Sequence, residues 1–264
     1  MSRPQATVRR VGLMPTANPK SEFRNRGRGG WADIPNSEFL ILNSGFSSCY
    51  HARMLSTVVL AAIMAGAVAS LLRAIRVEDR TQEVFSKTAA SITFVILGAS
   101  RWSSGDIVGG WLVAGLAFCA FGDVLLLGKR TFDVGLATFL LGHALYVAGF
   151  LVALPIERWS WLILAPLLIV SGSAARWLWP HLGRRRFSVL AYVVVISVMV
   201  WGGVSATTRG HLPWTAAVGA ILFYLSDLAV ARQRFVQQSF INRALGLPIY
   251  YLGQLLLAMT IGAR

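Results

Sequence analysis

Two aspartates lie inside long apolar stretches of this 264-residue sequence: Asp123 in GLAFCAFGDVLLLGKR and Asp227 in GAILFYLSDLAVARQR. An ionised side chain at the centre of a membrane helix costs roughly 3 kcal/mol on insertion scales, so such an acid implies a partner or a function. Two carboxylates that share a low-dielectric site disfavour each other's ionisation and can therefore differ in protonation state. A neutral acid beside an ionised one is suited to acid catalysis near neutral pH.

The two aspartate segments resemble each other. In each one a glycine lies eight residues before the acid, and a basic pair and a phenylalanine follow it: Gly115, Asp123, Lys129, Arg130 and Phe132 in the first, and Gly219, Asp227, Arg232, Arg234 and Phe235 in the second. The shared pattern leads to the hypothesis that one element is used twice, in a parallel repeat of four plus four helices.

The composition is that of a polytopic membrane protein. Hydrophobic residues make up 55% of the chain and charged residues only 14%, and the mean hydropathy is +0.60. The formal net charge of +14 does not indicate a nucleic-acid partner, because the basic residues cluster at the ends of apolar runs and no nucleic-acid-binding motif is visible. The expected partner is therefore the lipid bilayer.

Eight apolar runs predict eight membrane-spanning helices. Most of the runs have the ~20 residues that a helix needs to cross the hydrocarbon core. They cover residues 55–75, 84–100, 107–128, 133–154, 159–179, 187–207, 213–231 and 244–262. The second run is the shortest and contains Lys87, so it is expected to span while buried among its neighbours. The predicted fold class is an all-α, polytopic transmembrane bundle of eight helices.

The loops predict the orientation of the bundle. Basic residues gather in the loops that follow the first, third, fifth and seventh helices, which assigns those loops to the cytoplasm. The predominance of arginine over lysine indicates a bacterial gene, and we therefore predict a multi-pass protein of the bacterial inner membrane. Counted at 1.5 Å per residue from the basic loops, both aspartates lie about 8–9 Å inside the cytoplasmic boundary. The predicted site is thus near the cytoplasmic face.

Residues 1–53 are polar and basic and are predicted to form a disordered tail, ahead of a transmembrane domain that covers residues 54–264. This tail would bring its positive charge to the side that the loops assign to the non-cytoplasmic face. Translation that begins at Met54 would remove the conflict, and so would a number of spans that differs by one from the eight predicted. N-terminal sequencing of the native protein would contradict this hypothesis if it found residues 1–53.

Further polar residues lie in the same apolar stretches. Lys87 is at a depth comparable to that of the acids, where it would be a partner for an aspartate, a phosphate ligand or an interface lysine. His143, Tyr146 and Gln254 lie deeper, and they either form interhelical hydrogen bonds or line a cavity. Tyr250 is expected to pack with its hydroxyl satisfied. A purely structural alternative is that each aspartate only pairs with a cation such as Lys87.

Several reaction classes lack support in the sequence. There is no G-x-S-x-G motif and no phosphate-binding glycine loop, so nucleophilic esterase and nucleotide chemistry are disfavoured. The four histidines have no metal-ligand spacing, and two cysteines, Cys49 and Cys119, make no disulfide framework. We therefore expect neither a metal nor a cofactor, and the two aspartates remain the candidate catalytic residues.

Four motifs are similar to those of the YhhN-like lysoplasmalogenase family of eight-helix membrane proteins. They are FGDVLLL, the segment 132–146 that ends in FLLGHALY, then GAILFYLSDLAVARQRF, and PIYYLGQLLLA. Together they cover most of residues 84–262. The chain departs from the family pattern after Lys87, where it has threonine and the family has proline.

The resemblance implies hydrolysis of the vinyl ether bond of a lysoplasmalogen, which releases a fatty aldehyde and glycerophosphoethanolamine or glycerophosphocholine. Vinyl ethers are cleaved by protonation of the β-carbon and attack of water on the resulting oxocarbenium ion, much as in glycoside hydrolysis. One of Asp123 and Asp227 would donate the proton while the other stabilises the cation and directs water. The sequence leaves open which of the two does which.

The other candidate residues would bind or orient this lysophospholipid. His143, Tyr146, Tyr250 and Gln254 would orient groups or line the path of the chain, and Lys87 with Arg130 or Arg232 would meet the phosphate. The main alternative is a small proton-coupled transporter or a lipid-translocating protein, because paired intramembrane acids in a repeated bundle also suit proton coupling. A non-catalytic scaffold ranks third. The sequence does not indicate an oligomeric state.

Overall fold

The computed structural model describes residues 36–128 and 130–263. The chain divides into two compact units, and the boundary falls after Met54. Of the predicted tail, residues 1–35 lie outside the described residues. Residues 36–53 form the first part of a helix rather than irregular chain, because a helix, once nucleated, extends at little cost through residues without strong breakers.

The described chain is all-α and contains eight α-helices, which agree with the eight apolar runs of the sequence. They are α2 (Asn36–Arg76), α3 (Arg80–Arg101), α4 (Ile107–Leu125), α5 (Phe132–Ala153), α6 (Trp161–Leu178), α7 (Arg186–Thr208), α8 (Trp214–Ala231) and α9 (Phe240–Thr260). Short helical turns join some of them: η1 (Ile156–Arg158), η2 (Trp179–His181), η3 (Gly183–Arg185) and the π-helical turn η4 (Arg232–Val236).

Local sequence signals set several helix starts. Asp79 begins α3 by accepting a hydrogen bond from the Gln82 backbone N–H at 3.0 Å, and Asp106 begins α4 by accepting one from the Gly109 N–H at 2.9 Å. Each of these caps satisfies a backbone donor that the first turn of a helix leaves without a partner. The caps therefore fix the point at which each polar loop gives way to an apolar helix.

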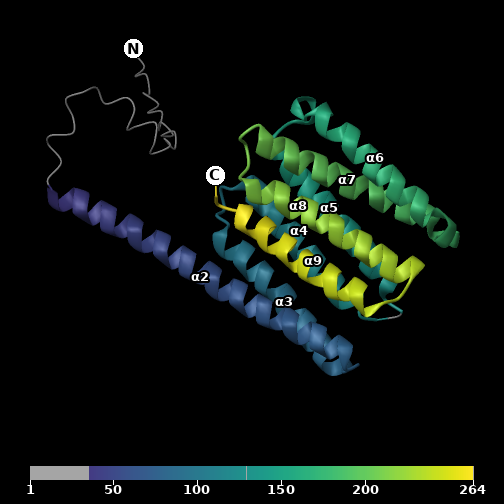
Figure 1. Ribbon diagram of the computed structural model, residues 1–264. Coiled ribbons are helices and arrows are strands. Elements are labelled where there is room, and N and C mark those ends of the chain that lie inside the picture. The colour runs from purple at the N-terminus through teal and green to yellow at the C-terminus, as the bar shows by residue number, and fades with distance from the viewer. Residues whose placement is uncertain (1–35, 129, 264) are drawn as a thin grey trace, which may run out of the picture. The chain divides into compact units, whose positions relative to one another are not determined.

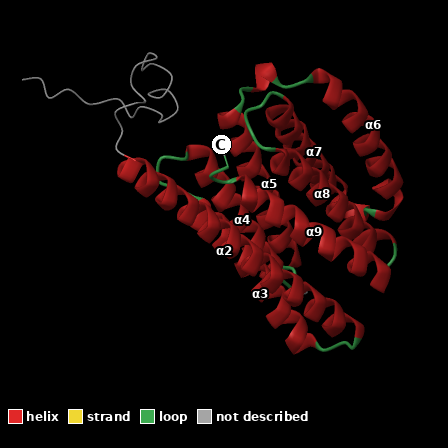
Figure 2. Ribbon diagram, turned by 60° about the vertical axis from the view of Figure 1, so that its left-hand side comes forward, coloured by secondary structure: helices red, strands yellow, loops and turns green. Residues whose placement is uncertain are grey.

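Six of the helices form a closed ring within residues 55–264. Contacts run from α3 to α4, from α4 to α5, from α5 to α7, from α7 to α8, from α8 to α9 and back to α3. Figure 1 shows α7, α8 and α9 side by side with α4 and α5 behind them, and Figure 2 shows α6 on the outer side of α7. This arrangement lets side chains from all six ring helices meet inside the bundle.

Glycines allow the closest helix pairs to form. A Cβ at Gly115 of α4 would lie 2.5 Å from the Tyr146 ring of α5, and a Cβ at Gly219 of α8 would lie 3.0 Å from the backbone oxygen of Gly253 in α9. Gly115 and Gly219 are equivalent positions in the two similar segments, so in both helix pairs a glycine at the same position allows the close approach. The repeat of four plus four helices stays a prediction, which superposition of the two halves tests.

Six helices of the described chain are long and apolar enough to cross a membrane, which makes the protein an integral membrane protein. They are Arg53–Arg76, Ile107–Leu125, Phe132–Ala153, Trp161–His181, Gly183–Thr208 and Trp214–Val236. The other two predicted spans form α3 and α9, which have 22 and 21 residues. Their hydropathy is lower because these two helices carry many of the polar side chains that face the interior of the ring, among them Lys87, Ser91, Tyr250 and Gln254.

Candidate active site

A small cavity of about 100 Å³ lies inside the ring and receives side chains from all six ring helices. Both sequence-predicted acids, Asp123 from α4 and Asp227 from α8, are in its wall. We call this space the inner cavity. Its other polar lining residues are Lys87, Tyr192, Ser226, Arg234 and Tyr250, and its apolar lining residues include Leu126, Phe132, Leu136, Phe139, Val189, Val230, Phe235 and Leu247.

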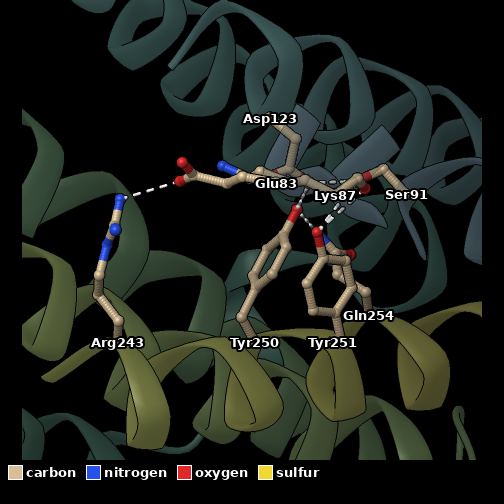
Figure 3. Close-up of polar contacts among 8 residues, drawn as sticks. All are labelled: Glu83, Lys87, Ser91, Asp123, Arg243, Tyr250, Tyr251 and Gln254. Carbon is tan, nitrogen blue, oxygen red and sulfur yellow. Dashed lines mark hydrogen bonds and ion pairs between the residues drawn. The ribbon is translucent and has the colours of Figure 1, made fainter. Parts of the chain in front are cut away.

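Asp123 is held by a cation and two hydroxyl groups (Figure 3). Its Oδ1 lies 3.1 Å from Lys87 Nζ, and its Oδ2 accepts hydrogen bonds from Ser91 Oγ at 2.7 Å and from Tyr250 Oη at 2.8 Å. The aspartate is only 2% exposed. An ammonium group and two hydroxyl donors thus surround this buried carboxyl group, and all three are complementary to a negative charge. The pairing with Lys87 anticipated as a structural alternative is thus present in the site.

A chain of hydrogen bonds behind the cavity fixes the direction of the Tyr250 proton. Tyr146 donates to Gln254 Oε1 at 2.7 Å, and Gln254 Nε2 donates to Tyr250 Oη at 3.2 Å. Because the Tyr250 hydroxyl accepts from the amide, its own proton is directed to Asp123. Tyr146 and Gln254 do not line the inner cavity, but they orient Tyr250, which does. Besides packing, Tyr250 donates a hydrogen bond to Asp123.

Asp227 has a different set of partners. Its Oδ2 accepts a hydrogen bond from Tyr192 Oη at 3.0 Å and lies 3.3 Å from Nε2 of His143. The imidazole of His143 is fully buried, and its ring packs at 4.3 Å, centroid to centroid, against Phe223. Among the described residues His143 Nε2 has no hydrogen-bond partner, since the 3.3 Å contact is not in line for one.

The tautomer of His143 follows from its other nitrogen. Nδ1 lies 2.6 Å from the backbone oxygen of Phe139, which can only accept a hydrogen bond, so Nδ1 carries a proton. In the neutral ring the unprotonated Nε2 would then lie 3.3 Å from a carboxylate oxygen, so two electron-rich atoms would be close together. One additional proton, on either Nε2 or Asp227, removes that repulsion. The two acids of the cavity thus lie in contrasting environments, with Asp123 beside a cation and Asp227 beside a buried imidazole.

A second, larger space adjoins the inner cavity at the end of the bundle where the basic loops lie. It has a volume of about 340 Å³, and we call it the vestibule. Lys87, Phe132, Arg234, Leu247 and Tyr250 line both spaces. Its other polar lining residues are Glu83, Gln233, Gln238, Asn242 and Arg243. The volume is near the lower end of the roughly 300–1,000 Å³ that is usual for small-molecule sites.

The two arginines predicted from the sequence to meet a phosphate lie elsewhere. Arg130 is exposed, and Arg232 donates to Asn242 Oδ1 at 2.9 Å. The cations that line the vestibule are Lys87, Arg234 and Arg243. Arg234 belongs to the π-helical turn η4, whose wider turn changes the direction of the side chains that follow α8.

Sequence reasoning also missed Glu83, Ser91 and Tyr192, which contact the acids or line the vestibule. Glu83 and Ser91 lie four residues on either side of the predicted Lys87, so all three lie along one face of α3, and this spacing is visible in the sequence. Tyr192 has a weaker signal, since it is a single hydroxyl within the apolar segment of α7.

Comparison with known proteins gives an independent line of information. The model of the YhhN family matches residues 82–261. Among curated relatives, the chain is 31% identical over 157 residues to "Lysoplasmalogenase TMEM86A" of Bos taurus, covering 56% of this chain and 64% of the relative. It is 34% identical over 152 residues to "Lysoplasmalogenase" of Mycobacterium tuberculosis (strain CDC 1551 / Oshkosh), covering 53% of this chain and 55% of the relative.

A third relative, "Lysoplasmalogenase TMEM86B" of Rattus norvegicus, is 32% identical over 152 residues, which cover 57% of this chain and 61% of the relative. The matched region therefore spans somewhat more than half of the length of each of these proteins. No solved structure matches the chain significantly.

Proposed function

The chain belongs to the YhhN family, and from this premise we propose that it hydrolyses the vinyl ether bond of lysoplasmalogens. Its relatives are named lysoplasmalogenases. The observation that carries the proposal is the inner cavity, where two carboxyl groups face one small space, one paired with the Lys87 ammonium group and the other beside the His143 imidazole. Acid-catalysed cleavage of a vinyl ether needs such a combination.

The reaction adds one water across the bond. A proton is added to the β-carbon of the vinyl ether, and the α-carbon becomes an oxocarbenium ion. Water attacks the α-carbon and loses a proton to a base, which gives a hemiacetal. The hemiacetal hydroxyl then gives its proton to the carboxylate that protonated the β-carbon, the bond to the glycerol oxygen breaks, and this oxygen takes up the proton that the base accepted from water. The products are a fatty aldehyde and the glycerophospho head group. The protonated acid is regenerated overall.

The contacts of the two aspartates support a division of roles between them. Asp123, ionised beside Lys87, stabilises the oxocarbenium ion and accepts the proton of the attacking water. Asp227 with His143 holds the proton that goes to the β-carbon. The volume of about 100 Å³ suffices for the reacting group and a water, at about 30 Å³ per water. The alkenyl chain must then extend from the cavity between helices toward lipid.

The position of the site accords with a lysolipid that enters from one membrane face. The vestibule lies at the bundle end that carries the basic loops, which the distribution of charge assigns to the cytoplasm. The proposed location is therefore the inner membrane of a bacterial cell, with the site open toward the cytoplasmic face. The surrounding bilayer would supply the substrate.

Turnover by the purified protein in detergent or nanodiscs tests the activity. Mass spectrometry of a panel of lysoplasmalogens and ester lysolipids is expected to show fatty aldehyde from the vinyl ethers and no fatty acid from the esters. Cleavage of esters alone would contradict the assignment. Because the assay contains no ion gradient, a proton-coupled carrier would give no product in it.

His143→Gln is expected to lower kcat at least about tenfold, with a smaller change in KM, because His143 holds the proton beside Asp227 without lining the cavity. In this variant Asp227 must take its proton from solvent. A kcat equal to that of wild type would show that His143 is only a packing residue.

A further inference from the structure

An ion pair crosses the vestibule from α3 to α9 (Figure 3). Glu83 Oε1 lies 3.1 Å from Arg243 Nη2, and its other oxygen, Oε2, lies 2.9 Å from Arg80 Nη1. The Glu83 side chain is 12% exposed and the Arg243 side chain 40%, so the arginine is the more accessible partner. Glu83 and Arg243 both line the vestibule. A negative and a positive group therefore face one another at the entrance to the inner cavity.

The groups along α3 have a fixed order of depth. Glu83, Lys87 and Ser91 are four residues apart, and four residues correspond to about 6 Å along a helix. Glu83 is nearest the end of the bundle, Lys87 lies one turn further in, and Ser91 contacts Asp123. A molecule that enters through the vestibule thus meets the Glu83–Arg243 pair first, the cations Lys87 and Arg234 next and the two acids last.

We propose that the vestibule binds a zwitterionic phosphate head group, with Glu83 as the ligand of its ammonium group and Arg243 and Arg234 as the ligands of its phosphate. This inference rests on the proposed function and names the part of the substrate that the vestibule selects. In an alkenyl lysolipid the order is amine, phosphate, glycerol and vinyl ether. Going inward, the complementary groups are Glu83 with Arg243, then Arg234 and Lys87, and last the acids of the inner cavity.

Arg234 is placed to take part because of its contact with Phe132. Its guanidinium carbon lies 4.0 Å from the centre of the Phe132 ring, and the residue lines both the vestibule and the inner cavity. A guanidinium that interacts with an aromatic face keeps its N–H donors in its own plane, where a phosphate oxygen can accept from them. Lys87 adds positive charge from the same wall while it pairs with Asp123.

The charge balance favours a zwitterion over a simple anion. When a zwitterionic head group enters, the Glu83–Arg243 ion pair breaks, Arg243 binds the phosphate, and Glu83 binds the ammonium group. Each charge keeps an opposite partner. A phosphoglycerol head group, which has no amine, would draw Arg243 away and bring its phosphate close to a carboxylate that has lost one of its cations. Like charges placed side by side across a binding surface oppose association.

Glu83→Gln tests this inference, because glutamine keeps the size and the acceptor oxygen of the side chain but not its charge. Two substrates with the same alkenyl chain are compared, one with phosphoethanolamine and one with phosphoglycerol. Wild type should favour the amine by about tenfold in kcat/KM, as expected for a partly exposed charged contact. In Glu83→Gln the ratio should fall to about one, and a ratio equal to that of wild type would overturn the inference.

Two further variants separate the roles. Arg243→Gln should lower kcat/KM for both substrates while the preference for the amine persists. Glu157→Gln is the matched control, because it removes an exposed carboxylate from the turn η1 at the other end of the bundle. It should leave the ratio as in wild type. A ratio that changed equally in Glu157→Gln would mean that the preference reflects the overall charge of the protein.

A binding measurement distinguishes failure of this inference from failure of the proposed function. Thermal shift of the purified protein is recorded with glycerophosphoethanolamine and with glycerophosphoglycerol, so that no turnover is needed. Wild type should be stabilised at a roughly tenfold lower concentration of the amine compound, and Glu83→Gln should lose that difference. Selective binding without aldehyde release would retain the head-group site and reject the reaction. Equal binding of both compounds to wild type would reject the head-group site.

Discussion

Asp227→Asn is expected to lower aldehyde release about 10²–10⁴-fold, the range that a positioned general acid contributes. Asparagine keeps the shape of the side chain and can still accept the hydrogen bond from Tyr192. It cannot hold an acidic proton beside His143, so protonation of the β-carbon would depend on solvent. The measurement is kcat on a lysoplasmalogen, alongside a thermal melt, and the melting temperature should change little because asparagine has the shape of aspartate and keeps the hydrogen bond from Tyr192.

Tyr192→Phe is the matched control for this variant. It removes the hydrogen bond to Asp227 Oδ2 but leaves the carboxyl group and its proton in place. A single neutral contact of this kind is worth about 1 kcal/mol, so the rate should fall by roughly tenfold or less. If Asp227→Asn had no greater effect than Tyr192→Phe, Asp227 would be a structural residue and the proton would come from elsewhere.

Asp123→Asn is expected to lose both activity and stability. The oxocarbenium ion would lose its counter-charge, with a loss of rate on the order of that in Asp227→Asn. In addition Lys87, whose side chain is 13% exposed, would lose its negative partner. Breaking a buried ion pair from one side costs about 3 kcal/mol of unfolding free energy. Kinetics and denaturation of the same preparation measure the two losses.

The double variant Lys87→Met, Asp123→Asn separates these two effects. Methionine retains the aliphatic length of lysine and removes the charge, so the cost of a lone buried cation disappears and much of the stability should return. Activity should not return, because the carboxylate is still missing. Recovery of both properties in the double variant would mean that Asp123 serves only to neutralise Lys87.

The fold could be predicted from the sequence because apolar runs of sufficient length leave few alternatives to helices in a membrane. The two acids could also be predicted from the sequence, since a charged residue in an apolar run is rare. Asp123 and Asp227 line the same cavity, but they contact different residues. Their helices α4 and α8 are each packed against α9, which brings both acids to the same space.

The partners of the acids were harder to predict. Consecutive helical residues point about 100° apart, so a count of basic residues in a loop cannot say which of them turns inward. Arg232 and Arg234 illustrate this, since the first bonds to Asn242 and the second reaches both spaces of the site. The π-helical turn η4 further changes the direction of these side chains, and no residue in the segment predicts such a turn.

Contacts between distant helices were equally hidden. Tyr192 meets Asp227 only because α7 and α8 are neighbours in the ring, and Gln254 links Tyr146 to Tyr250 only because α9 lies close to α5 and α4. Such contacts depend on the rotation of each helix about its own axis, which packing sets. Hydropathy along a single chain contains little of that information.

Hydrolysis of a lysoplasmalogen in D₂O by the purified protein tests the central claim most directly. Protonation of the β-carbon predicts that the fatty aldehyde carries one deuterium on the carbon next to its carbonyl group, and that the glycerophospho product gains none on carbon. Mass spectrometry of the trapped aldehyde measures the label. An aldehyde without deuterium, or release of fatty acid in place of aldehyde, would contradict vinyl ether cleavage by an intramembrane acid.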